Sequence, residues 1–173
     1  MKGVHMNFAK AQKEIINELL KGSRSMGRFN LDENNMLISP DGYKGYIIPV
    51  SAIVFNLEKI KEINPFPISD IIKEENELEL TPDLRIQDHY RAGMVRRLKG
   101  NGKNVYVNVK YLDCFQNPRF YQSGSNVGMI VVTEAVVVGG HGSKARIEHP
   151  VGIIMPVRCT WDDGTYYGDT ERV

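Results

Sequence analysis

Two six-residue segments of this 173-residue chain are nearly the same: GYIIPV at Gly45 to Val50 and GIIMPV at Gly152 to Val157. In both, a glycine precedes apolar residues that favour strands, and Pro-Val follows them. Proline cannot donate a backbone hydrogen bond to a neighbouring strand, so Pro49 is expected at an edge, a bulge or a strand end. Two such segments in one chain indicate a duplicated architecture. The alternative is that β-rich sequences repeat short Ile/Val motifs by chance.

The residues that precede the first hexapeptide predict a helix followed by strands. NFAKAQKEIINELLKG has helical spacing, with Gly22 as its stop and five apolar residues on one face: Phe8, Ala11, Ile15, Leu19 and Leu20. The segments GRFNLDENN, MLISPDGYK and GYIIPVSAIVFNL are broken by Asn, Asp and Gly, as in hairpins. We therefore expect a helix and a three-stranded meander in the first half, at about 6–58.

The second half repeats this order. NVYVNVKYLDCFQN predicts a strand, with Val105, Val107 and Val109 alternating, that runs into a short helical turn over Tyr111 to Phe115. RFYQSGS, VGMIVVTEAVVVGG, KARIEHP and VGIIMPVRC predict strands separated by Gly and Pro signals. The fold class is therefore α+β, one domain over 1–173, in which two helix-plus-antiparallel-sheet units are related by duplication. The second unit is expected at about 104–160, followed by a C-terminal tail at 161–173.

Residues of about 59–103 differ in character from both halves. An acidic, proline-containing stretch, NPFPISDIIKEENELELTPDLRIQDHY, precedes the basic RAGMVRRLKGNGK. We interpret this segment as a connector, part of it an extended loop or an added helix. Its basic residues Arg91, Arg96, Arg97, Lys99 and Lys103 either bind nucleic acid or neutralise the acidic run before them.

Composition limits the classes of function. The chain has 22 Lys and Arg against 21 Asp and Glu, so its overall charge predicts no strong attraction to nucleic acid or membranes, and any basic surface is local. Cys114 and Cys159 lack CxxC spacing and lie in apolar surroundings, which is typical of reduced thiols and predicts a cytoplasmic protein. No apolar run approaches the roughly 20 residues of a membrane span, and the first residues have no signal-peptide core.

VYVNVKYLDCF, followed about forty residues later by VGIIMPVRC, resembles the last domain of the bacterial β-clamp family of DNA polymerase sliding clamps. That domain carries an Asn-rich strand leading into a YLLDAL-like helix and closes on a strand resembling YVIMPMRL. The matching residues are Asn108, Lys110, Tyr111, Leu112 and Asp113, then Ile153, Ile154, Met155, Pro156, Val157 and Arg158. The resemblance covers Val105 to Cys159 in sequence and only the architecture of Phe8 to Leu57.

The resemblance implies a clamp domain of two units related by a pseudo-two-fold axis, with helices that face duplex DNA. Basic side chains would then meet phosphates without reading sequence. The candidates are Lys10, Lys13, Lys21, Arg24, Arg28 and Lys110, with Arg96, Arg97 and Lys99 from the connector; ordinary surface solubility is the alternative for all of them. A family ring is built from six such domains, so this chain would need six copies, a homo-oligomer.

The resemblance also implies a pocket for short peptides of replication proteins, at Met155, Pro156, Val157 and Arg158. The alternative is that Met155 and Val157 belong to the core. The tail, which the bacterial clamps lack, would be long enough to cover this pocket. A third interpretation is a phage-type or mobile-element interaction protein that uses the clamp fold as a decoy for a host replication protein, without encircling DNA.

An enzyme is the remaining class. GGHGSKARIEHP places His141, Glu148 and His149 near one hairpin, where they could serve a small metal-dependent site. Their spacing matches no zinc signature, and the three glycines describe a hairpin tip more simply. No nucleotide-binding or nucleophile motif occurs. We therefore expect a non-enzymatic protein without a metal or cofactor, acting in DNA replication as a processivity or DNA-associated factor.

Overall fold

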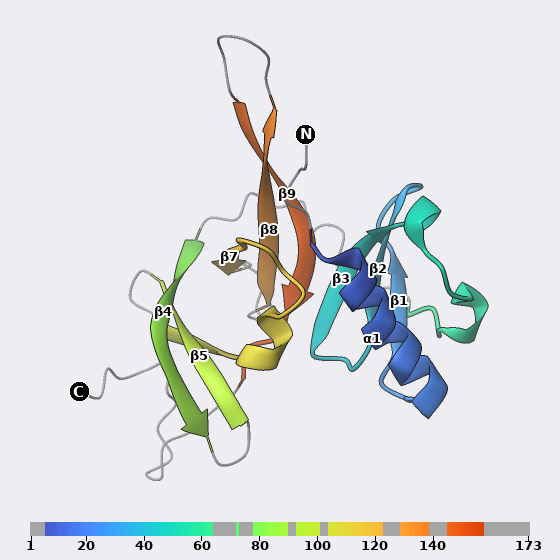
Figure 1. The fold of residues 1–173 in the computed structure, drawn as a ribbon, viewed down its shortest axis with the longest axis horizontal. Coiled ribbons are helices and arrows are strands. Elements are labelled where there is room, and N and C mark those ends of the chain that lie inside the picture. The colour runs from blue at the N-terminus through green and yellow to red at the C-terminus, as the bar shows by residue number, and fades with distance from the viewer. Residues whose placement is uncertain are drawn as a thin grey trace.

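In the computed structural model, the two similar hexapeptides lie on neighbouring strands of one antiparallel sheet (Figure 1). The structure describes residues 6–63, 72, 78–89, 93–100, 104–122, 129–138 and 145–157. Within these ranges the fold is α+β, with one α-helix, α1 (Phe8–Lys21), and nine strands. The strands are β1 (Gly27–Asn30), β2 (Asn35–Ser39), β3 (Lys44–Pro49), β4 (Leu78–His89), β5 (Gly93–Lys99), β6 (Asn104–Asn108), β7 (Arg119–Gln122), β8 (Ile130–Val138) and β9 (Ala145–Ile154).

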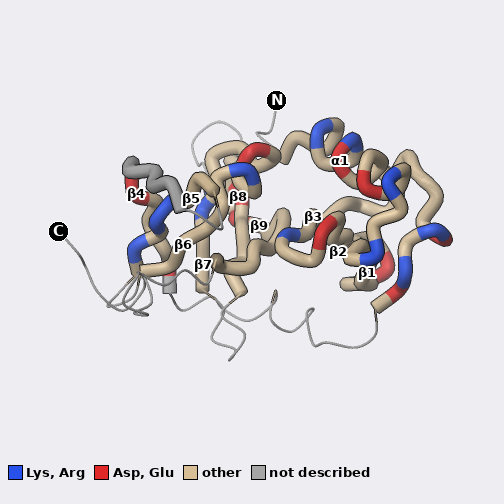
Figure 2. Tube along the Cα trace, turned by 90° about the horizontal axis from the view of Figure 1, so that it is seen from below, with Lys and Arg blue, Asp and Glu red and all other residues tan. Residues whose placement is uncertain are grey.

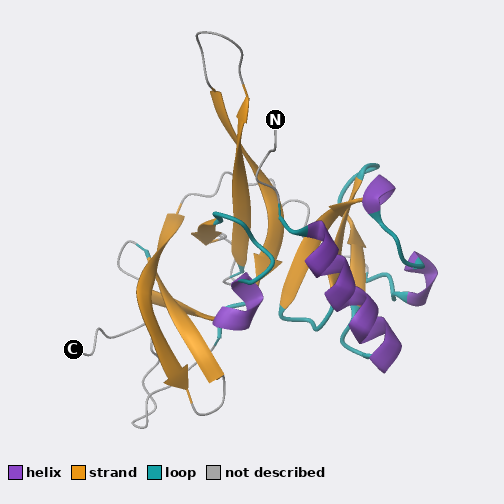
Figure 3. Cartoon of the chain, in the orientation of Figure 1, coloured by secondary structure: helices purple, strands orange, loops and turns teal. Residues whose placement is uncertain are grey.

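The strands are ordered β1-β2-β3-β9-β8-β7-β4-β5-β6 across the sheet. The predicted three-stranded meander of the first half is confirmed, because β1 pairs with β2 and β2 with β3, both antiparallel. Four segments were predicted as strands after the second helical turn. They form the three strands of a second meander, β7-β8-β9, because KARIEHP and VGIIMPVRC belong to one continuous strand, β9. Figure 3 shows α1 in front of the strands of the first meander.

The near-repeat lies at the boundary between β3 and β9, where Lys44 pairs with Ile154, Gly45 with Ile153 and Tyr46 with Gly152. A Cβ atom on Gly152 would lie 2.5 Å from the carbonyl oxygen of Gly45 and 2.7 Å from the ring of Phe115. The glycine that opens the second hexapeptide is therefore needed because another strand and an aromatic ring touch its Cα. Pro49 is the last residue of β3, as its lack of an N–H requires.

Helix α1 begins at an asparagine cap and ends at Gly22, the residue predicted as its stop. The side chain of Asn7 accepts a hydrogen bond from the Lys10 amide, and Gly22 ends the helix with a left-handed backbone at φ +69°. Ala11 and Ile15 are buried, and Phe8 and Leu19 pack against the core. The expectation for Leu20 was wrong: its side chain is 82% exposed, because the helix buries a stripe too narrow to include it.

The core lies on both faces of the sheet. On the α1 face, residues such as Ile15, Ile38 and Ile48 pack with Phe115 in one cluster of buried side chains. On the opposite face, a smaller cluster includes Leu37, Ile47, Val131 and Ile153. Successive strand residues alternate between these faces, which is why the unbroken apolar runs of β2 and β3 supply both clusters.

Part of the segment expected to be a connector is neither an extended loop nor an added helix. Residues 78–89 and 93–99 form the long strands β4 and β5, which pair with each other antiparallel. β4 also pairs with β7, and β5 pairs with β6, so this hairpin is part of the sheet. The alternation that marks a strand is hidden by the many charged residues of the segment. The remaining part of the expected connector beyond residue 63, apart from residue 72, and the tail lie outside the described residues.

The helical turn of the second half is shorter than α1. It is the 3-10 turn η3 (Val109–Leu112), beginning two residues before the predicted one and capped by the side chain of Asn108. Two further 3-10 turns, η1 (Val50–Ala52) and η2 (Leu57–Lys59), follow β3. The described residues therefore hold one α-helix, rather than one in each half.

Replacing Gly152 by alanine tests the close approach of β3 and β9. We expect Gly152→Ala to lower the free energy of unfolding by about 3 kcal/mol, because the added Cβ meets a backbone oxygen that cannot move alone. Gly45→Ala is the matched control: its Cβ meets the side-chain ends of Leu37 and Ile153, so about 1 kcal/mol is expected. Urea unfolding measures both. Equal losses would contradict the assigned register.

Candidate functional site

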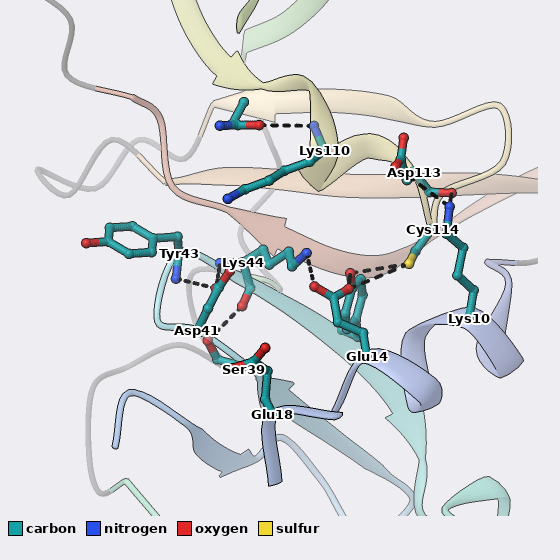
Figure 4. A network of polar contacts seen from close by, with 12 residues as sticks. Lys10, Glu14, Glu18, Ser39, Asp41, Tyr43, Lys44, Lys110, Asp113 and Cys114 are labelled. Carbon is teal, nitrogen blue, oxygen red and sulfur yellow. Dashed lines mark hydrogen bonds and ion pairs between the residues drawn. The ribbon is translucent and has the colours of Figure 1, made fainter. Parts of the chain in front are cut away.

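A polar groove of about 570 Å³ lies between α1, η3 and the turn that joins β2 to β3. Its walls are mainly charged, and they bring together residues about 100 positions apart in the sequence (Figure 4). The lining residues are Lys10, Lys13, Glu14, Asn17, Glu18, Asp41, Lys44, Lys110, Asp113 and Cys114. Figure 2 shows that α1 lies above β1–β3 and carries basic and acidic residues along its length.

Local backbone interactions fix the positions of α1 and η3, which form two walls of the groove. The amide of Asn7 donates to the carbonyl of Cys114 at 2.9 Å, which joins the start of α1 to the end of η3. Residues 10, 13, 14, 17 and 18 recur at helical spacing, so they share the side of α1 that faces the groove. The Asn108 side chain accepts from the Lys110 amide at 3.1 Å and starts the η3 turn. The groove thus depends on two asparagine caps.

An ion pair between a buried lysine and a partly exposed glutamate forms the floor of the groove. Lys44 is only 4% exposed, and its ammonium group pairs with the carboxylate of Glu14. The same ammonium lies 5.0 Å from the ring centroid of Tyr111 and 5.7 Å from that of Tyr46. An isolated buried ammonium is very unfavourable, whereas a carboxylate and two aromatic faces together offset the loss of water.

Tyr46 and Cys114 complete the floor. The Tyr46 hydroxyl donates to Glu14 at 2.6 Å and lies 3.3 Å from the sulfur of Cys114. Burial and these neighbours raise the pKa of Tyr46 far above its usual range, and burial raises the pKa of Tyr111 to about 12. Burial also raises the pKa of the Cys114 thiol, so this cysteine has little thiolate character and is a structural thiol. The prediction that Cys114 is buried and reduced is confirmed; Cys159 lies outside the described residues.

The groove contains three of the predicted DNA-contacting residues. Lys10 donates to the carbonyl of Asp113 at 3.2 Å and lies 3.8 Å from its carboxylate. Lys13 is exposed, and the Lys110 ammonium lies over the ring of Tyr111 at 5.2 Å. Among the described residues, no carboxylate forms an ion pair with Lys13 or Lys110.

The acidic residues of the groove are already engaged. Glu14 binds Lys44 and Tyr46, Glu18 binds Lys21 at 2.7 Å, and Asp41 accepts the amides of Tyr43 and Lys44. Asp113 lies beside Lys10. Within the described part of the chain, Lys13 and Lys110 are therefore the cations of the groove that pair with no carboxylate.

The other predicted basic residues lie outside the groove. Arg28 on β1 binds the Ile60 carbonyl and the Glu62 carboxylate, and Arg24 is exposed beyond the end of α1. Arg96, Arg97 and Lys99 lie on β5, near the far end of the sheet. Arg97 binds Asp83 at 2.6 Å and Lys99 lies 3.7 Å from the same carboxylate, so for these two residues neutralisation of a neighbouring acid is the observed role.

The described residues among those predicted to form a peptide pocket lie in different places. Met155 lines an apolar cavity of about 240 Å³ on the sheet face opposite α1, together with Phe29, Tyr43, Ile63, Met129 and Ile153. Val157 lies elsewhere, with its amide bonded to the carbonyl of Tyr106 on β6 at 2.7 Å. Pro156 lies between them and is half-buried, and Arg158 lies outside the described residues. Among the described residues, Met155 and Val157 therefore do not line the same cavity.

The histidine hairpin gives no described metal site. His141 lies outside the described residues, and His149 lines a small apolar cavity beside Asp32 and Pro150. Glu148 is bonded to Arg119, to the Tyr121 hydroxyl at 2.7 Å and to Thr133 at 3.3 Å. No group of three or more potential metal ligands occurs in the part of the chain that the structure describes.

Sequence reasoning missed the floor of the groove. Lys44 reads as a turn lysine between two glycines, and Tyr46 reads as an ordinary strand residue. Nothing in the local pattern indicates that Glu14, thirty positions earlier, lies against both. The only available signal is the position of Glu14 around the helix, because it lies at the boundary between the apolar stripe and the polar side.

The chain was compared with known proteins. No protein family, curated protein or solved structure is detectably similar to it. No helix among the described residues has the length and apolar character needed to cross a membrane.

A double-mutant cycle tests the ion pair between Lys44 and Glu14. We expect Lys44→Met to lower the free energy of unfolding by about 2–3 kcal/mol, because Glu14 keeps its charge but loses its partner. The double variant Glu14→Gln with Lys44→Met should regain at least half of this loss, since no unpaired carboxylate remains. Denaturant unfolding of the four proteins gives the coupling energy. Strict additivity of the two single changes would contradict the pairing.

We expect the stabilisation that Glu148 provides to be lost in acid. Burial acts to raise its pKa, but the hydrogen bonds from Tyr121 and Arg119 outweigh burial, and the pKa lies below its usual 4.5. The ionised form therefore stabilises the fold above the unfolded pKa, and this contribution is lost as the pH falls through the lowered folded value. Glu148→Gln should be less stable than the wild type at pH 7, and the gap should narrow at pH 3. A gap of constant size in urea unfolding would contradict this.

Proposed function

We propose that this chain is a non-enzymatic, DNA-clamp-like protein that binds the phosphate backbone of duplex DNA at the groove between α1 and η3. Its role would be that of a processivity or DNA-associated factor in replication. The observation that carries the proposal is the pair of lysines, Lys13 and Lys110, that face one groove from two distant parts of the chain with no carboxylate partner among the described residues. Such cations bind phosphates without reading base sequence.

The arrangement of strands supports the clamp-like part of the proposal. The order β1-β2-β3-β9-β8-β7 is symmetric about the β3–β9 boundary, and a helical element precedes each meander. Gly45 and Gly152 are equivalent positions of the two hexapeptides, and so are Tyr46 and Ile153. Exchanging equivalent residues turns the pair of Gly45 with Ile153 into the pair of Gly152 with Tyr46, which is the next pair between the same two strands. A pseudo-two-fold axis between the hexapeptides accounts for both facts. β4 and β5 would then be an insertion between the units.

Whether copies can form a ring depends on the two outer strands of the sheet, β1 and β6, because copies would join through their edges. The outward backbone groups of Arg28 on β1 bond to Lys61 and Ile63, and Tyr106 on β6 accepts from Val157. Joining copies through these edges would require both segments to move. The proposal is therefore DNA binding on the groove side, and encirclement by six copies is not needed for it.

The second candidate is a clamp-fold adaptor or phage-type decoy that binds a peptide of a replication protein. The observation that favours it is the apolar cavity at Met155, which opens on the face opposite the groove. Because the two sites lie on different faces of the sheet, one chain could serve both purposes. Loss of DNA binding by the groove variants would leave this cavity unchanged.

Titration of fluorescent duplex DNA by anisotropy, at several salt concentrations, tests the first proposal. Lys13→Glu and Lys110→Glu should each weaken binding and lower the slope of log affinity against log salt by about 1, because each removes one phosphate contact. Sequence changes in the DNA should have little effect. The matched control is Lys59→Glu, an exposed lysine on η2 outside the groove.

Lys59→Glu should bind DNA as the wild type does, apart from a small change due to net charge. If the wild type binds no duplex DNA at low salt, or if all three variants weaken binding equally, groove-specific DNA binding is wrong. The adaptor proposal would then be the remaining candidate.

A further inference from the structure

β8 and β9 continue beyond the rest of the sheet as a two-stranded arm (Figures 1 and 3). The pairs from Glu134 with His149 to Val138 with Ala145 belong to this arm. β7 pairs with β8 only as far as Thr133, and β3 pairs with β9 only as far as Gly152. Among the residues that the structure describes, no strand therefore adjoins the arm on either side.

The arm exposes apolar side chains. Ile147 on β9 is 53% exposed and Val137 on β8 is 54% exposed. Free strand edges that carry exposed apolar residues favour pairing with another strand, and proteins normally cover them or protect them with charge. The outermost strands of the main sheet, β1 and β6, already bond to the backbone of residues 61–63 and 157. The arm is one of the stretches of the described sheet that have no described strand beside them; β4 beyond Leu80, on its β7 side, is another.

The β9 edge is complementary to itself. Its sequence around Ile147 is Arg146-Ile147-Glu148. If two copies pair antiparallel about Ile147, each Arg146 lies opposite Glu148 of the other copy, and the two isoleucines face each other. Opposite charges and large apolar residues at facing positions stabilise antiparallel pairs. A two-fold axis generates this arrangement without any further contact surface.

The side chains are placed for this pairing. Glu148 is held by Arg119 and Tyr121 and is 25% exposed, so its position is fixed before a partner arrives. The Arg146 side chain is 58% exposed and lies 4.0 Å from Glu148 of its own chain, so it has room to reach a second carboxylate. The exposed part of β8 offers Ala135, Val136 and Val137 and therefore no charge pair that would fix a register.

We propose that the β9 arm is a self-association surface that binds a second copy of this chain, edge to edge, by antiparallel pairing centred on Ile147. The resulting dimer has a continuous ribbon of four strands made from two arms. This interaction is independent of the DNA-binding proposal, because its residues lie away from the α1–η3 groove.

Disulfide trapping tests the register. In a Cys159→Ser background, which leaves the buried Cys114 as the other thiol, Ile147→Cys places two cysteines opposite each other across the proposed axis. Val137→Cys is the matched control, since it is equally exposed on the same arm but lies on the outer strand of the four. Under mild oxidation, covalent dimer should form about tenfold faster for Ile147→Cys than for Val137→Cys. Equal rates, or no dimer from either, would overturn the proposal.

Light scattering of the full chain across a concentration series provides the second measurement. The mass should rise from 19.6 kDa toward twice that value. Arg146→Glu places like charges at both facing positions and should raise the dimer dissociation constant by about tenfold. The control is Arg24→Glu, an exposed arginine near the end of α1. A wild type that stays monomeric at all concentrations, or an equal effect of both changes, would contradict pairing through β9.

Discussion

The antiparallel contact between β3 and β9 is the constraint on which the rest of the structure depends. It joins the two meanders into one sheet, and it does so at a place where a glycine Cα meets the backbone of the other strand. Phe115 packs against the same glycine and also contacts the ring of Tyr46, with centroids 5.8 Å apart. The same few residues therefore take part in strand pairing, in core packing and in the floor of the groove. A change to one of them affects all three.

The groove is a consequence of how α1 is attached. Its apolar stripe packs on the sheet, and a few polar side chains tie it to neighbouring segments. Gln12 is one of these, since its side chain bonds to both the Ala52 carbonyl and the Val54 amide at 2.9 Å. The ion pair of Glu14 and Lys44 is another. Because η3 is only a short turn, it does not fill the space beside α1, and charged side chains line what remains.

The parts of the fold that could be predicted are those set by local pattern. The caps Asn7 and Gly22, the meander β1-β2-β3 and the strand β6 all follow from periodicity and turn residues. The strands β4 and β5 were missed because their charged residues mask the alternation. The two hexapeptides were interpreted as a sign of duplication, and their direct pairing could not be inferred, since no local rule states which strand lies beside which. For the site, Lys10, Lys13 and Lys110 were predicted, whereas the buried Lys44 was not, because burial of a lysine depends on partners that only the folded chain supplies.

The position of β9 also determines when the sheet can be completed. β3 ends at Pro49, but its neighbour β9 ends at Ile154, so more than 100 residues must be synthesised between the two. At about 5–20 residues per second, the first meander waits on the order of ten seconds at the ribosome with the β3 edge unpaired. Such long-range pairing slows folding and leaves an apolar edge open to other chains during that interval. A nascent chain of this protein is therefore most exposed to misassociation, and most dependent on chaperones, after its first hairpins have formed and before its last strand emerges.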